Sequence, residues 1–374
     1  MTAPAIRYPL LHIFPSFEIG GSQMRFATLA NCLAARYRHV ILAMDNRHQA
    51  ASLLNSDVDY TLLPYTLNKR SSPANLLAYR RIIRDSGARR LVTYNWGATE
   101  WGLANLIGGI PHLHIEDGFG PEETRRQIPR RVWFRRLALA RAQPIVLPSR
   151  TLEKIARDIW GFAAEKIAYV PNGVDCTRFE GRADPALCAE LGLDGGIPII
   201  GTVAGLRPEK NVARLLRAFA LVLKHHRARL AIAGTGTQRE MLAALAQELG
   251  IAPHVVFAGH LARVERILPA FSVYTISSDT EQMPISLIEA MAASLPVAAV
   301  NVGDIASMVA AENRPFITPV DEVPLATAMA DLLADPGRRR RIGSANADKA
   351  RSDFSEDRMI AAYDALYSGR PLPA

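Results

Sequence analysis

The 374-residue sequence contains only three cysteines, Cys32, Cys176 and Cys188, and none lies in a CxxC pair or at metal-ligand spacing. This scarcity excludes a disulfide-built fold and predicts free thiols in a reducing cytoplasm. The chain also lacks an apolar run of the roughly 18–20 residues needed to cross a bilayer. Its first residues lack a basic start followed by an apolar core, so we expect no signal peptide.

Acidic residues are scarce in the first half of the chain, so the net positive charge of the protein is confined to that half. Residues 1–175 hold 23 Lys and Arg against 14 Asp and Glu, whereas residues 176–374 hold 21 against 22. The basic half indicates a polyanionic partner, which could be nucleic acid, an anionic membrane surface or a phosphorylated ligand. The overall composition, 49% hydrophobic and 21% charged, is typical of a globular protein, and the length of 374 residues suggests two domains.

Short apolar segments alternate with amphipathic segments along the whole chain. We expect strands at 10–14, 39–44, 88–94, 144–149, 197–205, 229–234, 254–259, 273–277 and 296–300, and helices at 22–36, 211–226 and 353–368. Nearly continuous apolar runs of this kind fit parallel strands that are buried on both faces. The sequence therefore predicts an α/β protein with two successive doubly wound units, separated within residues 180–198.

Two glutamates in the second half are candidate ligand contacts. Glu281 and Glu289 are eight residues apart, which on a helix would separate them by ~12 Å. They could not share a proton at that distance, but they could contact both ends of an extended ligand, such as a sugar and a ribose around a diphosphate. The alternative is one loop carboxylate and one solvated helix carboxylate.

Two turns that follow expected strands have the composition of phosphate sites. Arg207 and Lys210 lie in a strand-to-helix turn, where two cations and a helix N-terminus suit a diphosphate. Gly20 and Gly21 lie in the first such turn, where glycine lets the backbone approach a ligand closely. Ordinary surface cations and an ordinary turn are the alternatives, and the glycines do not form a GxGxxG fingerprint.

A titratable cluster and a basic segment follow one another in the first half. His114, Glu116 and Asp117 end an expected strand, so they are either ligand contacts or structural groups.

Residues 124–141 contain Trp133, Phe134, Leu137 and seven arginines: Arg125, Arg126, Arg130, Arg131, Arg135, Arg136 and Arg141. The segment suits an anionic lipid surface, with a solvated basic helix as the alternative. Nothing in it matches a nucleic-acid recognition element.

Four segments in this order resemble family 4 of the glycosyltransferases, retaining enzymes with the GT-B fold. They are PNGVDCTRF (171–179), GLRPEKN (205–211), LAIAGTGTQREML (230–242) and EQMPISLIEAMAASLPVAA (281–299). The resemblance implies two Rossmann-like doubly wound domains that face each other across a cleft. The acceptor-binding domain would span 1–185 and the donor-binding domain 186–352, with residues 353–374 packing back on the first.

The resemblance also implies roles for individual residues. Arg207 and Lys210 would hold the donor diphosphate, Glu289 the ribose, and Glu281 the transferred sugar. Gly20 and Gly21 would line the site near the donor phosphate. The remaining donor contacts are expected at Gly205, Gln282, Met283, Pro284 and Ile285.

One catalytic position has two candidates. The family places a histidine near the anomeric centre in an H-x-E-H-G segment, and this chain reads His114-Ile115-Glu116-Asp117-Gly118. Asp117 stands at the usual histidine position, and His114 is the alternative.

The expected function is metal-independent, retaining sugar transfer from a UDP- or GDP-sugar, without a cofactor. The acceptor would be a glycan or a polyprenyl-diphosphate-linked sugar in surface polysaccharide biosynthesis. The enzyme would be cytoplasmic and would touch the inner membrane face through residues 124–141, without binding nucleic acid. Because Gln282 and Met283 depart from the family pattern, the alternative is a catalytically inactive nucleotide-sugar-binding protein of the same fold.

Overall fold

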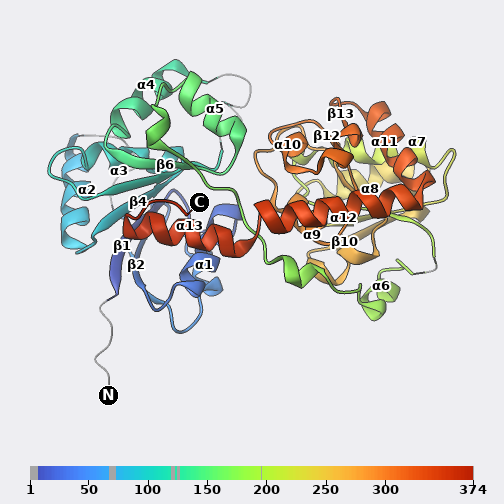
Figure 1. Ribbon diagram of the computed structural model, residues 1–374, viewed down its shortest axis with the longest axis horizontal. Coiled ribbons are helices and arrows are strands. Elements are labelled where there is room, and N and C mark those ends of the chain that lie inside the picture. The colour runs from blue at the N-terminus through green and yellow to red at the C-terminus, as the bar shows by residue number, and fades with distance from the viewer. Residues whose placement is uncertain (1–6, 67–72, 119–122, 124–126, 195, 374) are drawn as a thin grey trace. The chain divides into compact units, whose positions relative to one another are not determined.

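A computed structural model divides the chain into two compact units. The first unit comprises Met1–Asn172 and Met359–Ala374, and the second comprises Gly173–Arg358 (Figure 1). The structure describes residues 7–66, 73–118, 123, 127–194 and 196–373. The change of unit at 172/173 precedes the expected 185/186, because Val174, Cys176 and Phe179 pack into the core of the second unit.

The first unit is built on a seven-stranded parallel sheet with the strand order β3-β2-β1-β4-β5-β6-β7. The strands are β1 (Tyr8–Phe14), β2 (Tyr37–Ala43), β3 (Asp59–Leu63), β4 (Arg90–Tyr94), β5 (His112–Ile115), β6 (Ala142–Leu147) and β7 (Ile167–Tyr169). The order reverses between β1 and β4. Loops that follow these two strands therefore diverge to opposite sides and leave a crevice at the carboxyl edge of the sheet.

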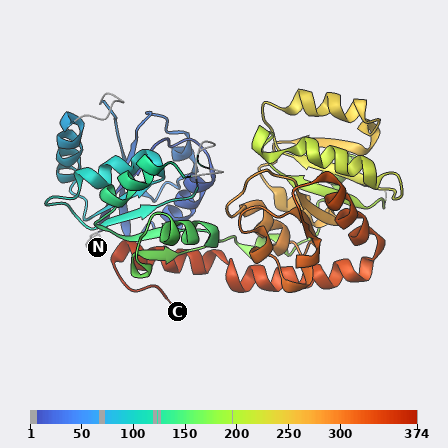
Figure 2. The same cartoon turned by 90° about the horizontal axis from the view of Figure 1, so that it is seen from above.

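Helices cover both faces of this sheet (Figures 1 and 2). They are α1 (Gly21–Cys32), α2 (Pro73–Asp85), α3 (Thr99–Ala104), α4 (Pro129–Ala138), α5 (Arg150–Asp158) and α13 (Glu356–Ser368). Alternate residues of β1 face the two layers: Leu10 and Phe14 pack with α1 and α13, and Leu11 and Ile13 pack with α2 and α3. The C-terminal helix thus belongs to the core of the first unit.

The second unit repeats the plan with a six-stranded parallel sheet of order β10-β9-β8-β11-β12-β13. The strands are β8 (Ile199–Val203), β9 (Arg229–Ala233), β10 (Val255–Gly259), β11 (Val273–Ile276), β12 (Val297–Val300) and β13 (Ile317–Thr318). The helices are α6 (Pro185–Glu190), α7 (Val212–Val222), α8 (Arg239–Glu248), α9 (Ile285–Ala292), α10 (Ile305–Met308), α11 (Glu322–Ala334) and α12 (Pro336–Asp353). Here the order reverses between β8 and β11.

Both units are therefore Rossmann-like doubly wound α/β domains, as the sequence predicts. Each expected strand is present, with ends shifted by a few residues, and the helix expected at 22–36 ends at Cys32. β5 corresponds to the strand expected to end at His114, Glu116 and Asp117, whereas β3, β7 and β13 lie outside the expected ranges. Cys32, Cys176 and Cys188 are free thiols. None of the helices in the described part of the chain is long and apolar enough to cross a membrane.

Candidate functional site

The loops that follow β8 and β11 lie side by side at the switch point of the second sheet. The Asp279 N–H donates to the carbonyl of Glu209 (2.8 Å), and the Ser277 hydroxyl donates to the carbonyl of Lys210 (3.2 Å). Doubly wound sheets bind their ligands in the crevice at this point. The fold therefore brings the predicted cationic turn and the predicted carboxylate segment to one place.

Lys210 and Glu281 form the centre of this crevice. The Lys210 Nζ lies 2.6 Å from the Glu281 Oε1. The same carboxylate oxygen accepts a hydrogen bond from the Ser278 hydroxyl (2.7 Å). Both ionic side chains are largely buried, so their attraction is screened less than that of a surface pair. The predicted diphosphate cation and the predicted sugar-binding carboxylate are thus direct partners.

Arg207 lies at the rim of the same turn. Its side chain is 62% exposed, and its Nε is 2.9 Å from the Glu209 carboxylate. A Cβ added at Gly205 would lie 3.7 Å from the Arg207 Nε, so packing alone does not require glycine there. Because Arg207 is exposed, its side chain can rotate toward a ligand at little cost in free energy. Lys210 is largely buried and paired with Glu281, so its side chain stays in place.

Two glycines of the loop after β9 support this turn. A Cβ at Gly234 would lie 1.9 Å from the Ala204 carbonyl oxygen, and one at Gly236 would lie 2.3 Å from that of Leu206. The Leu206 N–H also donates to the Thr235 carbonyl (2.8 Å). The structure assigns these glycines to close backbone packing beneath the cationic turn.

A polar cluster that the motif analysis missed joins the two loops. The Asn211 side-chain amide donates to both carboxylate oxygens of Asp279 (3.0 and 3.1 Å). Arg214 pairs with Asp279 at 2.6 Å and donates to the Ser277 carbonyl at 2.7 Å. Asn211 also caps α7, because its Oδ1 accepts the Arg214 N–H. An Asn immediately before an apolar helical run was the signal available in the sequence.

The segment 281–284 is a loop, and α9 begins at Ile285, so helical spacing does not apply between Glu281 and Glu289. The side chains of Gln282, Pro284 and Ile285 are partly exposed, whereas Met283 is buried in the core. The Asp304 N–H donates to the Gln282 carbonyl (3.0 Å). Asp304, the residue before α10, thereby holds the backbone of this loop in place.

Glu289 lies in the second turn of α9. Burial raises its pKa to about 7, although the nearby positive charge of Arg178 opposes that shift, and Glu265 adds to it. Near neutral pH its carboxyl group is therefore present in both protonation states. It can accept or donate a hydrogen bond to a ligand hydroxyl.

In the first unit, Asp117 is held by a buried cation on α1. Two nitrogens of Arg25 contact the two Asp117 oxygens at 2.7 and 2.9 Å. Arg25 also donates to the Asn172 side-chain oxygen (2.8 Å). Arg25 is 5% exposed and the Asp117 side chain 20%. The carboxylate therefore has a fixed position and some surface open to solvent.

His114 has no such surface. Its ring is fully buried, with Nδ1 2.8 Å from the Thr93 hydroxyl and Nε2 3.5 Å from the Glu116 carboxylate. Burial and the charge of Arg135 lower the pKa of His114 to about 3, although Asp117 opposes this shift. Its imidazole is therefore neutral near pH 7. Of the two candidates for the family's histidine position, only Asp117 can meet a ligand in this conformation.

Gly20 and Gly21 form the N-terminus of α1. Gly20 is the extended N-cap, and its carbonyl accepts the Met24 N–H (2.8 Å). A Cβ added at Gly21 would meet nothing within 4 Å. Packing within the described residues does not explain glycine at this position, which leaves open space beside the backbone.

The basic segment is not a uniform cationic surface, which corrects the expectation for residues 124–141. Arg135 is fully buried, lies 2.8 Å from the Glu123 carboxylate and stacks over the rings of Trp96 and Trp160. Arg131 also bonds to Glu123 (3.2 Å). A buried, paired arginine cannot contact a membrane.

The exposed part of the segment is a mixed apolar and basic face of α4 and the residues after it. It comprises Arg130, Trp133, Arg136, Leu137 and Arg141. Trp133 is 65% exposed. Arg125 and Arg126 lie outside the described residues. In the rest of the chain that the structure describes, no group of three or more His, Cys, Asp or Glu side chains could hold a metal ion.

Comparison with known proteins places both halves of the chain in one family. The sequence model described as "Glycosyltransferase Family 4" matches residues 19–178, and that described as "Glycosyl transferases group 1" matches residues 185–349.

Two relatives show the extent of the similarity. The D-inositol 3-phosphate glycosyltransferase of Nocardia farcinica is 29% identical over 251 residues, 64% of this chain and 54% of that protein. The GDP-mannose-dependent alpha-(1-6)-phosphatidylinositol monomannoside mannosyltransferase of Mycobacterium tuberculosis is 32% identical over 216 residues, 53% and 54% of the two chains. The matched part thus spans about half the length of these relatives.

The fold is shared with solved structures at low sequence identity. Anabaena Alr3699/HepE in complex with UDP superposes with a TM-score of 0.82 at 18% identity, covering 97% of this chain and 100% of that one. An identity this low demonstrates a common architecture only.

Proposed function

Because the chain belongs to glycosyltransferase family 4, we propose that it transfers a sugar, with retention of anomeric configuration, from a UDP- or GDP-sugar to a glycan or a lipid-linked acceptor. One observation carries the proposal: Lys210 and Glu281 are joined at the switch point of the second unit, where a diphosphate and a sugar would bind together. Relatives named for GDP-mannose, and a fold neighbour solved with UDP, support a nucleotide-sugar donor.

The second unit binds the donor. Lys210 contacts the diphosphate while keeping its bond to Glu281, since an ammonium group has three donors. Arg207 turns from the rim to supply a second cation. Glu281 accepts hydrogen bonds from the sugar hydroxyls, and Glu289 bonds to the ribose. Met283 is buried, so the donor meets it through its backbone, whereas the side chains of Gln282 and Pro284 are partly exposed and can contact the donor directly.

The chemistry requires stabilisation of a leaving group. The anomeric C–O bond breaks, and its electron pair stays on the departing nucleoside diphosphate. Lys210 is a pre-positioned cation for that charge, and Arg207 joins it when it turns in from the rim, so no metal ion is required. With retention, the acceptor hydroxyl attacks from the face that the leaving group occupies. The departing phosphate oxygen is then placed to take the hydroxyl proton.

In the first unit, the ligand contacts are made by Asp117 and by the backbone at Gly20 and Gly21. Asp117 accepts a hydrogen bond from a hydroxyl of the transferred sugar, and Arg25 fixes its orientation. The open backbone at Gly21 lets a ligand approach the N-terminus of α1. The Asp117 carboxylate and the backbone at Gly21 therefore already have their geometry before a ligand binds.

Membrane contact is part of the same proposal. Trp133 and Leu137 are exposed, and Arg136 and Arg141 lie beside them. Aromatic and cationic side chains together suit the interface of an anionic bilayer. A cytoplasmic enzyme that touches the inner membrane face through this surface could reach lipid-linked acceptors in surface polysaccharide synthesis.

The test is turnover with UDP- and GDP-sugars, in buffer containing EDTA, with lipid-linked and free glycan acceptors. We expect a product whose anomeric configuration, read by NMR coupling, matches that of the donor. Nucleotide binding without hydrolysis or transfer would instead identify an inactive nucleotide-sugar-binding protein. Loss of activity in EDTA, restored by a divalent ion, would contradict metal independence.

A further inference from the structure

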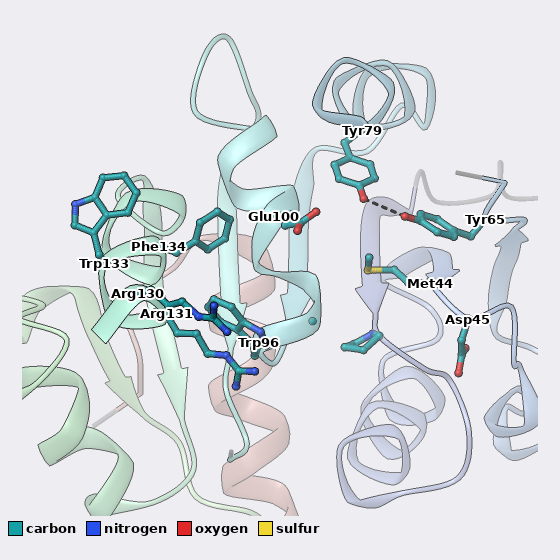
Figure 3. Close-up of a pocket in the computed structure, with 12 residues that line it drawn as sticks. Met44, Asp45, Tyr65, Tyr79, Trp96, Glu100, Arg130, Arg131, Trp133 and Phe134 are labelled. Atoms are coloured by element: carbon teal, nitrogen blue, oxygen red, sulfur yellow. Dashed lines mark hydrogen bonds between the residues drawn. The ribbon is translucent and has the colours of Figure 1, made fainter. Parts of the chain in front are cut away.

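The first unit contains a cavity of about 780 Å³ at the carboxyl edge of its sheet, between the strand ends and helices α2, α3 and α4 (Figure 3). Its lining is mostly apolar and aromatic. Trp96 and Phe134 meet edge to face at 5.6 Å on one side. On the other side the hydroxyls of Tyr65 and Tyr79 are 3.0 Å apart. A volume of this size accommodates a ligand of one or two sugar rings.

Charge is divided between the two sides of the cavity. Arg130 and Arg131 project from α4, whereas Asp45 lies on the opposite side, with Glu100 between them (Figure 3). Behind the α4 side, Arg131 and the buried Arg135 bond to the Glu123 carboxylate, and the Arg135 Nε lies 3.9 Å from the carboxyl group of Glu116. Burial raises the pKa of Glu116 to about 8, so this carboxyl group carries little negative charge near pH 7. The guanidinium groups therefore exceed the carboxylates there, which favours an anion at that end of the cavity.

The carboxylates favour hydroxyl groups at the other end. Asp45 and Glu100 present acceptor oxygens. The aromatic faces between the two ends suit the apolar C–H face of a sugar or cyclitol ring. The lining thus matches a ligand that carries an anionic group at one end and a ring with hydroxyls at the other.

The cavity adjoins the proposed catalytic position of the first unit. Trp96 follows Asn95, whose side-chain oxygen accepts the Asp117 backbone N–H (2.7 Å). Asn95 has a φ of +57°, a strained conformation for a non-glycine residue. A Cβ at Gly97 would lie 2.8 Å from Pro15, so the loops after β1 and β4 are in contact. The cavity therefore opens at the switch point of this sheet, beside the residue that positions Asp117.

We propose that this cavity is the acceptor site and that it takes a phosphorylated sugar or polyol. The phosphate lies on Arg130 and Arg131, the ring packs against Trp96, and the hydroxyls bond to Glu100 and Asp45. This inference rests on the proposed sugar transfer and specifies its acceptor class. The same chemistry occurs in a free sugar phosphate and in a phosphorylated lipid headgroup.

Calorimetry without any donor tests the site directly. The probes are glucose 1-phosphate, mannose 1-phosphate and myo-inositol 1-phosphate, with glucose and myo-inositol as uncharged controls. Phosphatidylinositol in mixed micelles represents the lipid source. We expect at least one phosphorylated probe to bind and its uncharged counterpart to bind at least ~10-fold more weakly, since the charge-assisted bonds are lost. Binding of the micelles alone would identify a lipid headgroup as the source.

Two variants locate the binding. Arg130→Gln should weaken the probe at least ~10-fold, and Glu100→Gln should weaken it without removing the preference for phosphate. Arg157→Gln on α5, outside the cavity, is the matched control and should bind as the wild type does. Unchanged melting temperatures would show that the variants fold. The assignment is overturned if no phosphorylated probe binds, or if Arg130→Gln binds as tightly as Arg157→Gln.

Donor turnover separates this inference from the proposed function. If a nucleotide sugar is turned over, yet Arg130→Gln changes neither probe binding nor the KM of the acceptor, the cavity assignment is wrong and sugar transfer stands. If the probe binds through Arg130 but no nucleotide sugar is bound or hydrolysed, sugar transfer is wrong and the anion site stands.

Discussion

Arg25 and Asp117 form a two-point ion pair that fixes helix α1 to the end of β5, with nitrogen–oxygen distances of 2.7 and 2.9 Å. Arg25 is almost fully buried and also bonds to Asn172. The pair therefore has a structural role as well as the catalytic one proposed for Asp117. The two roles can be separated, because stability and turnover are measured independently.

Replacing Asp117 by Asn should lower both stability and turnover. The amide keeps the shape, but it leaves the buried Arg25 without its counter-charge, which should cost about 2–3 kcal/mol in urea unfolding. We expect kcat to fall at least ~10-fold at temperatures where the variant is folded. Glu18→Gln, which breaks an exposed pair with Arg47, should cost less than about 1 kcal/mol. Equal losses of stability in the two variants would contradict the structural role.

Lys210→Ala should reduce kcat/KM for the nucleotide sugar by about 10²–10³, because a cation that stabilises the leaving group is lost. Stability should also fall, by about 1–3 kcal/mol, because the largely buried Glu281 loses its counter-charge, so the kinetics are measured at temperatures where the variant is folded. Lys224→Ala, an exposed lysine that follows α7, is the control. Wild-type kinetics in Lys210→Ala would exclude this lysine from the donor site.

Gly21→Ala should separate packing from ligand contact. An added Cβ meets nothing within 4 Å, and Gly21 is the first residue of α1. The substitution should therefore raise stability slightly, by up to about 1 kcal/mol. If the ligand approaches this backbone as proposed, kcat/KM nevertheless falls. Thermal melting and steady-state kinetics on one preparation decide the point, and unaltered kinetics would remove Gly21 from the site.

Acid should destabilise the first unit through its buried histidines. Burial, with the charge of Arg7, lowers the pKa of His39 to about 4, and burial beside His114 lowers that of His112 to about 3. An unfolded histidine titrates near 6.5. As pH falls from about 6.5 to 4, these histidines bind protons in the unfolded chain but remain neutral in the folded chain. The free energy of unfolding should drop by up to about 1.4 kcal/mol per pH unit and histidine.

A carboxyl group acts in the opposite direction over part of that range. Burial raises the pKa of Glu116 to about 8, so the stability that it contributes is lost as pH rises from about 4.5 to 8. Urea midpoints from pH 4 to 8 should therefore pass through a maximum. His39→Gln should flatten the acid limb, whereas the exposed His225→Gln should not. An acid limb of unchanged slope in His39→Gln would refute the assignment.

Membrane binding should depend on apolar side chains of α4 as well as on charge. Replacing Trp133 and Leu137 together by Ser should lower partitioning onto phosphatidylglycerol vesicles by at least ~10-fold. Met241 and Val323, exposed apolar residues of the second unit, form the matched control pair. Binding should also weaken at high salt, because Arg136 and Arg141 are exposed. Equal binding by both double variants would identify α4 as a solvated helix.

Sequence reasoning grouped the candidate residues of the second unit more completely than those of the first. Arg207, Lys210 and Glu281 follow apolar strands, and parallel strands bring such loops to one edge. The sequence did not reveal the support beneath them, because Asn211, Arg214 and Asp279 look like ordinary polar residues of turns and helix starts. In the first unit it singled out His114 and Asp117 together, and only burial distinguishes them.

The sequence by itself determined the architecture, since the period of apolar residues and the chemistry of turns are local properties. It also placed candidate cations and carboxylates after the apolar strands. Tertiary structure alone decided which of these groups are available. Arg25 meets Asp117 and Asn172 across 92 and 147 residues, Arg135 is withdrawn from the basic face, and the cavity gathers side chains from three helices and several strand ends. Such pairings depend on packing between distant segments, which no local pattern encodes.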